Sequence, residues 1–286
     1  MSASAAVGAG TVAVIYQPMR ADTRPLAERC AEYLAGRGRP ARLLSSWDLD
    51  PDESTAGLDL AIAFGGDGSL LRVARWLAAS RVPIVGVKMG RLGFLSELTP
   101  DDLFTGLDPY LAGDYWLDGR AMLRAERLPG DGPAVEQTDE RQLVALNDAV
   151  VSRGMAGRAV RLAIEVDGME LMNYTADGVI VATATGTTAY SFAAGGPILM
   201  PELENLVVTP ICAHLHGING LVLPPDVAVT IRVSTEHPAG LTLDGHIDYP
   251  LLDGQAVTLR VAAERTLFAR RGSRAAFYRA ILDKLR

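Results

Sequence analysis

The residues of this chain best suited to chemistry are Gly65-Gly66-Asp67-Gly68. They follow the apolar run 58–64 and precede a segment, 69–75, with leucines on one face and arginines on the other, so the pattern predicts a strand, a glycine-rich turn and a helix. Glycines let a ligand approach the backbone closely, and the first N–H groups of a helix bind phosphate. Asp67 places a carboxylate beside such phosphates, where it can accept a proton from an attacking hydroxyl or help to hold a metal ion. The turn therefore predicts phosphoryl transfer.

An adjacent amide and acid, Asn147 and Asp148, lie within an apolar run at 144–151. Polar groups in such a run are costly to bury unless they find hydrogen-bond partners. Two interpretations follow. Either the pair caps or bridges the end of a strand, or Asn147 bonds a nucleobase edge or a ribose while Asp148 accepts hydrogen bonds from ribose hydroxyls.

Hydroxyl groups, small side chains and glycines are concentrated in the segment 184–197. It follows an Asp-Gly pair at 177–178 that begins a predicted strand. The residues that supply hydroxyls where this loop becomes a helix are Thr185, Thr187, Thr188 and Ser191. A loop-to-helix junction of this kind can bind phosphate or ribose. Tyr190, in the same segment, either stacks on an aromatic ring or fills the core, and composition favours the core.

The glycine-rich segment 86–95 carries a basic residue on each side of Gly90, namely Lys88 and Arg91. It is either a loop over anionic groups or a connector between two domains. Other nucleotide signatures fail, because no Gly-Lys-Ser or Gly-Lys-Thr occurs and the glycines at 8–10 precede a strand instead of following one. The four histidines show no spacing typical of metal ligands, so no metal site formed by protein ligands alone is predicted.

The composition narrows the class of protein. The 286 residues are 49% hydrophobic and 21% charged, as expected of a globular chain of one or two domains. A net charge of −7 argues against a nucleic-acid partner, which would require a basic face. Cys30 and Cys212 match no zinc or redox pattern, and we expect both to be buried. Without a signal peptide or a bilayer-spanning run, the expected location is cytoplasmic, with no membrane partner.

The first part of the chain alternates strands and helices. Strands are predicted at 11–16, 41–45, 59–64 and 83–87, and helices at 25–35 and 69–79. Strands separated by single helices form a parallel sheet, so the N-terminal domain is predicted to be α/β with a Rossmann-like parallel sheet. Ligands of such sheets bind beyond the carboxyl ends of the strands, where Asp67 lies.

From about residue 118 the pattern changes to strands without regular helices between them, which predicts a mostly antiparallel β C-terminal domain. The predicted strands are 121–127, 145–152, 162–166, 178–181, 227–233, 241–243, 256–261 and 267–269. Residues 127–142 predict a mobile hairpin tip or loop. An amphipathic helix at 273–285 is expected to return to the first domain. The predicted domains are 1–118 with 272–286, and 119–271.

Taken together, these motifs resemble those of the NAD kinase family along most of the chain. The shared segments are 65–68, 90–95, 147–148, 176–178, 185–191 with 195–197, and 244–245. Members of that family phosphorylate the adenosine 2′-hydroxyl of NAD to give NADP. The resemblance implies an α/β N-terminal domain, a β-rich C-terminal domain and a final helix that returns to the first. Lipid kinases share the acidic glycine turn but lack the segment 188–191.

The resemblance also implies roles for individual residues. Asp67 would be the base that activates the 2′-hydroxyl, and Asn147 and Asp148 would hold adenosine. The full set of implied dinucleotide- and phosphate-binding residues is Gly65, Gly66, Gly68, Arg72, Phe94, Asn147, Asp148, Arg158, Thr175, Asp177, Thr185, Thr187, Thr188, Ala189, Tyr190, Ser191 and His246. Mg²⁺ or another divalent metal would accompany the substrates NAD and ATP. The family forms dimers or tetramers with dinucleotide sites lined by neighbouring subunits, so a homo-oligomer is implied.

Several positions depart from the family pattern. Lys88 stands where asparagine is usual and Asp148 where glutamate is more frequent, while His216 and His246 lie in altered segments. These changes leave open a kinase of the same fold that acts on another nucleotide or nucleoside. A non-catalytic dinucleotide-binding regulator is disfavoured by the intact Asp67 and its glycines. The phosphate donor (ATP, another triphosphate or polyphosphate), the choice between NAD and NADH, and dimer against tetramer stay open.

Overall fold

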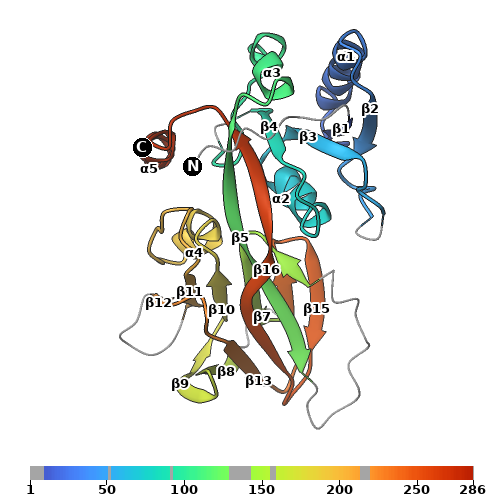
Figure 1. Cartoon of the computed structure of the whole chain (residues 1–286). Coiled ribbons are helices and arrows are strands. Elements are labelled where there is room, and N and C mark those ends of the chain that lie inside the picture. Colours follow the sequence, from blue (N-terminus) through green and yellow to red (C-terminus); the bar gives the residue numbers. More distant parts are fainter. Residues whose placement is uncertain are drawn as a thin grey trace. The chain divides into compact units, whose positions relative to one another are not determined.

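The structure, a computed structural model, describes residues 10–50, 53–90, 93–128, 143–154, 159–212 and 220–285. The chain divides into two compact units, residues 1–119 with 266–286 and residues 120–265. Two long strands, β5 (Trp116–Leu128) and β16 (Ala256–Arg270), pair with each other, and the division between the units falls within both (Figure 1). The first unit is α/β and the second is mostly antiparallel β, which confirms the predicted fold class.

Unit 1, residues 1–119 with 266–286, is built on parallel strands in the order β2-β1-β3-β4. Its elements are β1 (Thr11–Tyr16), α1 (Thr23–Ala35), β2 (Ala41–Ser45), β3 (Leu58–Gly65), α2 (Asp67–Trp76), β4 (Ile84–Lys88), α3 (Leu103–Leu111) and α5 (Ala276–Leu285). β1 and β3 are almost wholly buried, as expected of parallel strands in an α/β sheet. Apolar residues of α1 and α3, among them Leu34 and Leu107, share one core cluster with Val14 and Ile62 of the sheet.

The turn that carries Asp67 lies where the strand order reverses. The chain passes from β1 outward to β2 and then to the other side of β1 to form β3, and ligands of open α/β sheets bind beyond the carboxyl ends at such a point. Gln17, just after β1, lies close to the end of β3, because a Cβ added at Gly65 would be 3.5 Å from the Gln17 Cβ. The expected position of Asp67 beyond the carboxyl end of a parallel strand is confirmed.

Unit 2, residues 120–265, contains two layers of antiparallel strands. One has the order β12-β11-β10-β7-β14-β15, and the other contains β16-β13-β8-β9, with β5 paired to β16 and β6 paired to β5. The remaining elements are β6 (Val144–Ala145), β7 (Asp148–Arg153), β8 (Val160–Val166), β9 (Met169–Ala176), β10 (Gly178–Ala182), η2 (Gly186–Thr188), α4 (Tyr190–Ala193), β11 (Leu206–Ile211), β12 (Leu221–Leu223), β13 (Val229–Ser234), β14 (Ala239–Leu243) and β15 (Ile247–Leu251). Side chains of both layers, such as Val151 and Ile231, form one core.

The C-terminal helix α5 belongs to unit 1, as predicted, although it begins at Ala276 and not at residue 273. The ring of Phe277 lies 5.7 Å from that of Phe94, centroid to centroid. Tyr278 and Leu282 are exposed, so the apolar face of this helix is only partly covered by the described residues. None of the helices in the described ranges is long and apolar enough to cross a membrane.

Several predicted elements were wrong in extent. The predicted strand 145–152 is interrupted, because β6 ends at Ala145 and β7 begins at Asp148. The predicted strands 256–261 and 267–269 form the single strand β16. The predicted helix 69–79 is α2, which begins at Asp67 and ends at Trp76. Helix α3 and strands β9, β11, β12 and β15 were not predicted. Of the predicted loop 127–142, residues 127 and 128 belong to β5, and 129–142 lie outside the described residues.

The prediction for the two cysteines was half right. Cys30 is fully buried in α1, whereas Cys212 is exposed directly after β11, with a positive φ of 48°. The strand β11 was not predicted, so nothing in the sequence analysis placed Cys212 at the end of a strand.

Candidate active site

The glycine-rich turn is shaped by contact between its first glycine and the helix that follows. A Cβ at Gly65 would lie 2.5 Å from the Ser69 Oγ, so no other residue fits there without a shift. Gly66 and Gly68 are exposed, and nothing lies within 4 Å of a Cβ built at Gly66. The turn therefore leaves its backbone exposed at the start of α2, where the helix dipole favours an anion.

The carboxylate of Asp67 is held by a second segment of unit 1. Its Oδ2 accepts the backbone N–H of Phe94 at 3.1 Å, and its Oδ1 accepts that of Leu95 at 3.4 Å. Gly93 makes this approach possible, because a Cβ there would lie 2.1 Å from the Asp67 Oδ1. The side chain is only half-buried. Asp67 is thus fixed by the backbone and still accessible to a substrate.

In unit 2, the segment around Asn147 and Asp148 is organised by Asp244. The Asp244 carboxylate accepts the backbone N–H groups of Leu146 at 2.9 Å, Asn147 at 2.7 Å and Asp148 at 3.3 Å. Asp244 and Gly245 follow β14 with positive φ values of 51° and 66°, which turns the chain back into β15. Asp244, in the shared segment 244–245, therefore fixes the backbone between β6 and β7.

Asp148 is a buried residue with 5% of its surface exposed. Burial, with a further contribution from the nearby charge of Asp244, raises the pKa of Asp148 from 3.8 to about 7. Within the described part of the chain, no hydrogen bond to this carboxyl group is found, and the same holds for the half-buried side-chain amide of Asn147. Both groups can therefore bind a ligand, and the protonated carboxyl can act as a donor.

The threonine-rich segment packs directly against the backbone of Asn147. The Thr183 hydroxyl donates to the Leu146 carbonyl at 2.6 Å, and the Thr183 N–H donates to the Asn147 carbonyl at 2.8 Å. A Cβ at Gly186 would lie 2.0 Å from the same Asn147 oxygen, so glycine is required there. These contacts place the start of η2 beside Asn147.

The hydroxyls expected to face a ligand are largely bonded within the protein. Thr187 donates to the Ala184 carbonyl at 2.6 Å, and Thr188 to the Thr185 carbonyl at 3.2 Å. The Thr185 hydroxyl accepts a hydrogen bond from Arg120 at 3.3 Å. The Ser191 hydroxyl lies 2.9 Å from that of Thr209, and both are fully buried. These groups shape the loop from within.

Tyr190 differs from the prediction made from composition. It opens α4 with 47% of its surface exposed, so the expectation that it fills the core was wrong. Ala189 before it is half-buried. An exposed phenol ring at the start of a short helix is free to stack on a planar ring.

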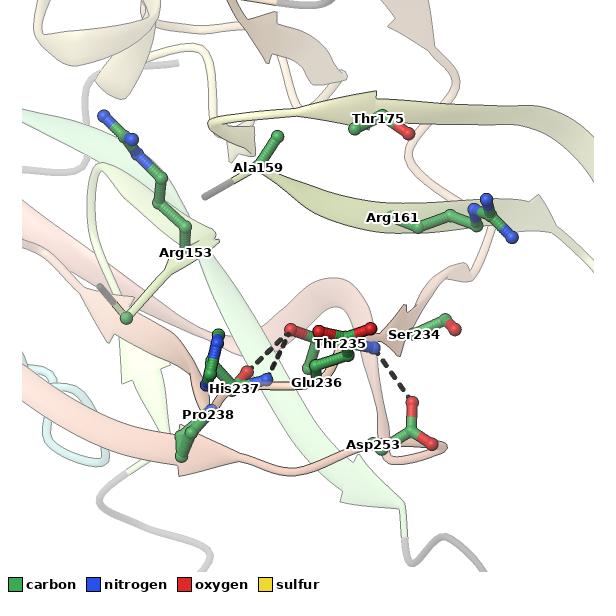
Figure 2. A pocket seen from close by; sticks show the side chains of 11 residues that line it. Arg153, Ala159, Arg161, Thr175, Ser234, Thr235, Glu236, His237, Pro238 and Asp253 are labelled. Atoms are coloured by element: carbon green, nitrogen blue, oxygen red, sulfur yellow. Dashed lines mark hydrogen bonds between the residues drawn. The ribbon is translucent and has the colours of Figure 1, made fainter. Parts of the chain in front are cut away.

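Thr175 and Asp177 lie away from Asn147 and Asp148. On paired strands, Gly178 faces Ser152 and Ala182 faces Asp148, so Asp177 is at the opposite end of β10, roughly 13 Å or more away at ~3.3 Å per residue. There the Asp177 carboxylate pairs with Arg153 at 3.2 Å. Thr175 lines a cavity of about 470 Å³ near this end, shown in Figure 2.

The other predicted residues are scattered between the two units. Arg72 of α2 lies over the ring of Trp47, with its guanidinium carbon 5.2 Å from the ring centroid. The half-buried Lys88 ends β4. His246 is half-buried, and its N–H donates to Leu243 in the turn that follows Asp244. Arg91, Arg158, His214 and His216 lie outside the described residues.

Three residues important to this geometry were not assigned a role from the sequence. They are Gly93, Asp244 as a backbone clamp, and Arg270, whose guanidinium bonds the carbonyl of Leu95 at 3.0 Å. Gly93 and Asp244 lie within motifs shared with the family, and this membership was the sequence feature that could have pointed to their roles. Arg270 stands beside a second arginine near the chain end, and nothing in its spacing points to a buried role.

The described residues do not form a binding site for a divalent cation from protein ligands alone. Among the described residues, no three His, Cys, Asp or Glu side chains come together as a metal site. Mg²⁺, however, usually keeps several waters and binds through one or two carboxylates together with substrate phosphates. The single accessible carboxylate of Asp67 beside an open anion-binding turn fits an ion of that kind.

Comparison with known proteins agrees with this arrangement of an α/β unit followed by a β unit. Residues 46–115 match the family described as ATP-NAD kinase N-terminal domain, and residues 146–271 match the ATP-NAD kinase C-terminal domain. An NAD kinase of Dehalococcoides mccartyi is 37% identical over 276 residues, which cover 96% of this chain and 95% of that protein. The chain therefore belongs to the ATP-NAD kinase family.

Solved structures show the same fold. An NAD kinase from Archaeoglobus fulgidus, crystallised in complex with ATP, has a TM-score of 0.77 at 24% identity and covers 94% of this chain and 99% of its own. A yeast NADH kinase complexed with NADH also has a TM-score of 0.77, at 23% identity, and covers 96% of this chain and 87% of its own.

Proposed function

We propose that this protein transfers the terminal phosphoryl group of ATP to the adenosine 2′-hydroxyl of NAD and so produces NADP. Membership of the ATP-NAD kinase family supports the reaction. The proposed mechanism rests mainly on the position of the Asp67 carboxylate. Two backbone N–H groups hold it beside the exposed turn at the start of α2.

In this mechanism Asp67 accepts the proton of the 2′-hydroxyl, and the oxygen attacks the terminal phosphorus in line with the departing diphosphate. The bond from phosphorus to the ribose oxygen forms as the bond to ADP breaks, and Asp67 later releases the proton to solvent. The reaction depends on positioning and charge more than on covalent chemistry. The exposed backbone at Gly66 and Gly68 would receive phosphate oxygens.

A divalent cation is part of the proposal. Mg²⁺ bound to the donor phosphates would neutralise their charge, and Asp67 is the residue that we expect to contact it. The turn 65–68 and Asp67 orient the donor, and the backbone of Phe94 and Leu95 keeps the carboxylate in place.

The acceptor would be held chiefly by unit 2. Asn147 and Asp148 offer an amide and a carboxyl group that make no hydrogen bond within the described part of the chain, and Tyr190 offers an exposed ring for adenine. The other residues proposed to line the sites for donor and acceptor are Arg72, Phe94, Arg158, Thr185, Thr187, Thr188, Ala189, Ser191 and His246. Those with buried hydroxyls would act by shaping the loop.

A second copy of the chain would complete the site. Thr175 and Asp177 lie at the opposite end of β10 from Asp148, so a dinucleotide fragment bound at Asp148 need not contact them in the same chain. A homo-oligomer in which a neighbour supplies Thr175 and Asp177 resolves this separation. The choice between dimer and tetramer, and the cytoplasmic location, stay predictions.

The decisive experiment is an assay for NADP formation by the purified protein with ATP, Mg²⁺ and NAD. Parallel reactions with NADH, free nucleosides, other triphosphates and polyphosphate define the acceptor and the donor. Phosphorylation of a nucleoside but not of NAD would favour the alternative acceptor. Tight NAD binding without NADP would instead point to a non-catalytic regulator.

A further inference from the structure

The segment 93–98, which contains the hydrogen-bond donors to Asp67, is itself hydrogen-bonded to the C-terminal end of β16. The Arg270 guanidinium donates to the Leu95 carbonyl at 3.0 Å and to the Phe94 carbonyl at 3.5 Å. In the other direction, the Glu97 carboxylate accepts the backbone N–H groups of Arg271 and Gly272. The segment 93–98 and residues 270–272 are therefore joined in both directions, although they are far apart in sequence.

Arg270 is a buried charge with a buried partner. It is 8% exposed, and its Nε lies 3.2 Å from Oδ2 of Asp118, which is 4% exposed. A buried ion pair contributes little net stability compared with apolar packing, because both charges lose their hydration. The position of this pair, next to the carbonyl groups of the segment that binds Asp67, therefore points to a role in geometry.

The geometry points to Arg270 as the positioning residue for Asp67, an inference that rests on the proposed function. The peptide group between Phe94 and Leu95 accepts from Arg270 through its carbonyl and donates to Asp67 through its N–H. Hydrogen bonds in such a chain polarise one another, so the cation strengthens the donor that faces the carboxylate. Asp118 fixes the guanidinium, and Arg270 fixes the peptide groups that orient Asp67.

A double-mutant cycle tests this assignment. Turnover is measured for the wild type, Arg270→Lys, Asp67→Asn and the variant with both changes. If Arg270 acts through Asp67, R270K lowers kcat roughly 10- to 100-fold, with KM for NAD and ATP within about twofold, and has almost no further effect in the D67N background. Arg271→Ala is the matched control, because that neighbouring side chain pairs with the exposed Asp114 and should leave kcat unchanged.

A second measurement does not depend on activity. Hydrogen exchange of the backbone amides in 93–98 should accelerate in R270K and stay unchanged in R271A. If R270K does not fold, Arg270→Met combined with Asp118→Asn removes the cation without leaving a buried unpaired charge, and replaces it in both experiments.

The outcomes separate the two proposals. An equal loss of kcat in both backgrounds, a wild-type kcat in R270K, or unchanged exchange in 93–98 would overturn the role of Arg270. A wild-type protein that forms no NADP would overturn the proposed function, while the exchange measurement still decides whether Arg270 holds this segment.

Discussion

Gly186 lies so close to Asn147 that a single methyl group would collide with its backbone. The added Cβ would be 2.0 Å from the Asn147 carbonyl oxygen and 2.5 Å from the carbonyl carbon. The contact joins the threonine-rich loop to the amide proposed to bind the acceptor, so stability and binding should change together when it is altered.

We therefore expect Gly186→Ala to lower the free energy of unfolding by about 1–3 kcal/mol, as is typical of overpacking, and to raise KM for NAD. Denaturant titration and steady-state kinetics measure the two effects. Gly240→Ala is the control, because nothing lies within 4 Å of a Cβ built there. If Gly186→Ala and Gly240→Ala had the same free energy of unfolding and the same KM for NAD, the loop would have to move away from Asn147 at no cost.

The buried carboxyl group of Asp148 should make stability depend on pH. Its pKa is raised from 3.8 to about 7, so the folded protein binds this proton more tightly than the unfolded chain does. The stabilisation is complete below about pH 4 and is lost as the pH rises to about 7, by at most about 1.4 kcal/mol per pH unit. Asp148→Asn should remove that slope in denaturant titrations at several pH values. If the free energy of unfolding changed with pH in the same way in the wild type and in D148N, the raised pKa of Asp148 would be contradicted.

Asp67→Asn should lower kcat by roughly 10²–10⁴-fold, the usual contribution of a general base, with little change in the affinity for NAD. The variant keeps an oxygen that can accept the Phe94 N–H, so its thermal unfolding should resemble that of the wild type. Asp108→Asn, at an exposed aspartate on α3, is the control for removal of a carboxylate. An Asp67 variant with full turnover would remove this residue from the mechanism.

Two inactive variants should restore activity when they assemble together. D67N lacks the base and Asp177→Asn lacks the group proposed to come from the neighbouring chain. In a dimer of one D67N chain and one D177N chain, about half of the sites would combine an intact Asp67 with an intact Asp177 from the partner. Co-expression with two different tags and an NADP assay on the doubly purified complex measures the recovery. Purified mixed oligomers without activity would refute a shared site.

The sequence predicted best the elements whose pattern is local. The continuous apolar run of β3, the glycines after it and the amphipathic face of α2 lie within about twenty residues, and each agrees with the others. Asp67 at the carboxyl edge of a parallel sheet followed from that pattern alone.

The length of β16 could not be predicted, because charged residues interrupt its apolar pattern. Glu264 pairs with Arg124, and Arg265 pairs with Glu204 at 2.6 Å, so the ion-pair partners of these charges are distant in sequence. The same holds for Asp244, which bonds backbone groups about a hundred residues earlier. Periodicity reports which residues are buried, and it carries no information on partners of this kind.

The contrast between the two cysteines has a practical use. Cys30 is fully buried, and burial raises its pKa to about 12, whereas Cys212 is exposed. Because thiolates are the reactive form, a maleimide dye should attach to one position per chain without any mutagenesis. Energy transfer between dyes on neighbouring copies would then measure the spacing of subunits in solution.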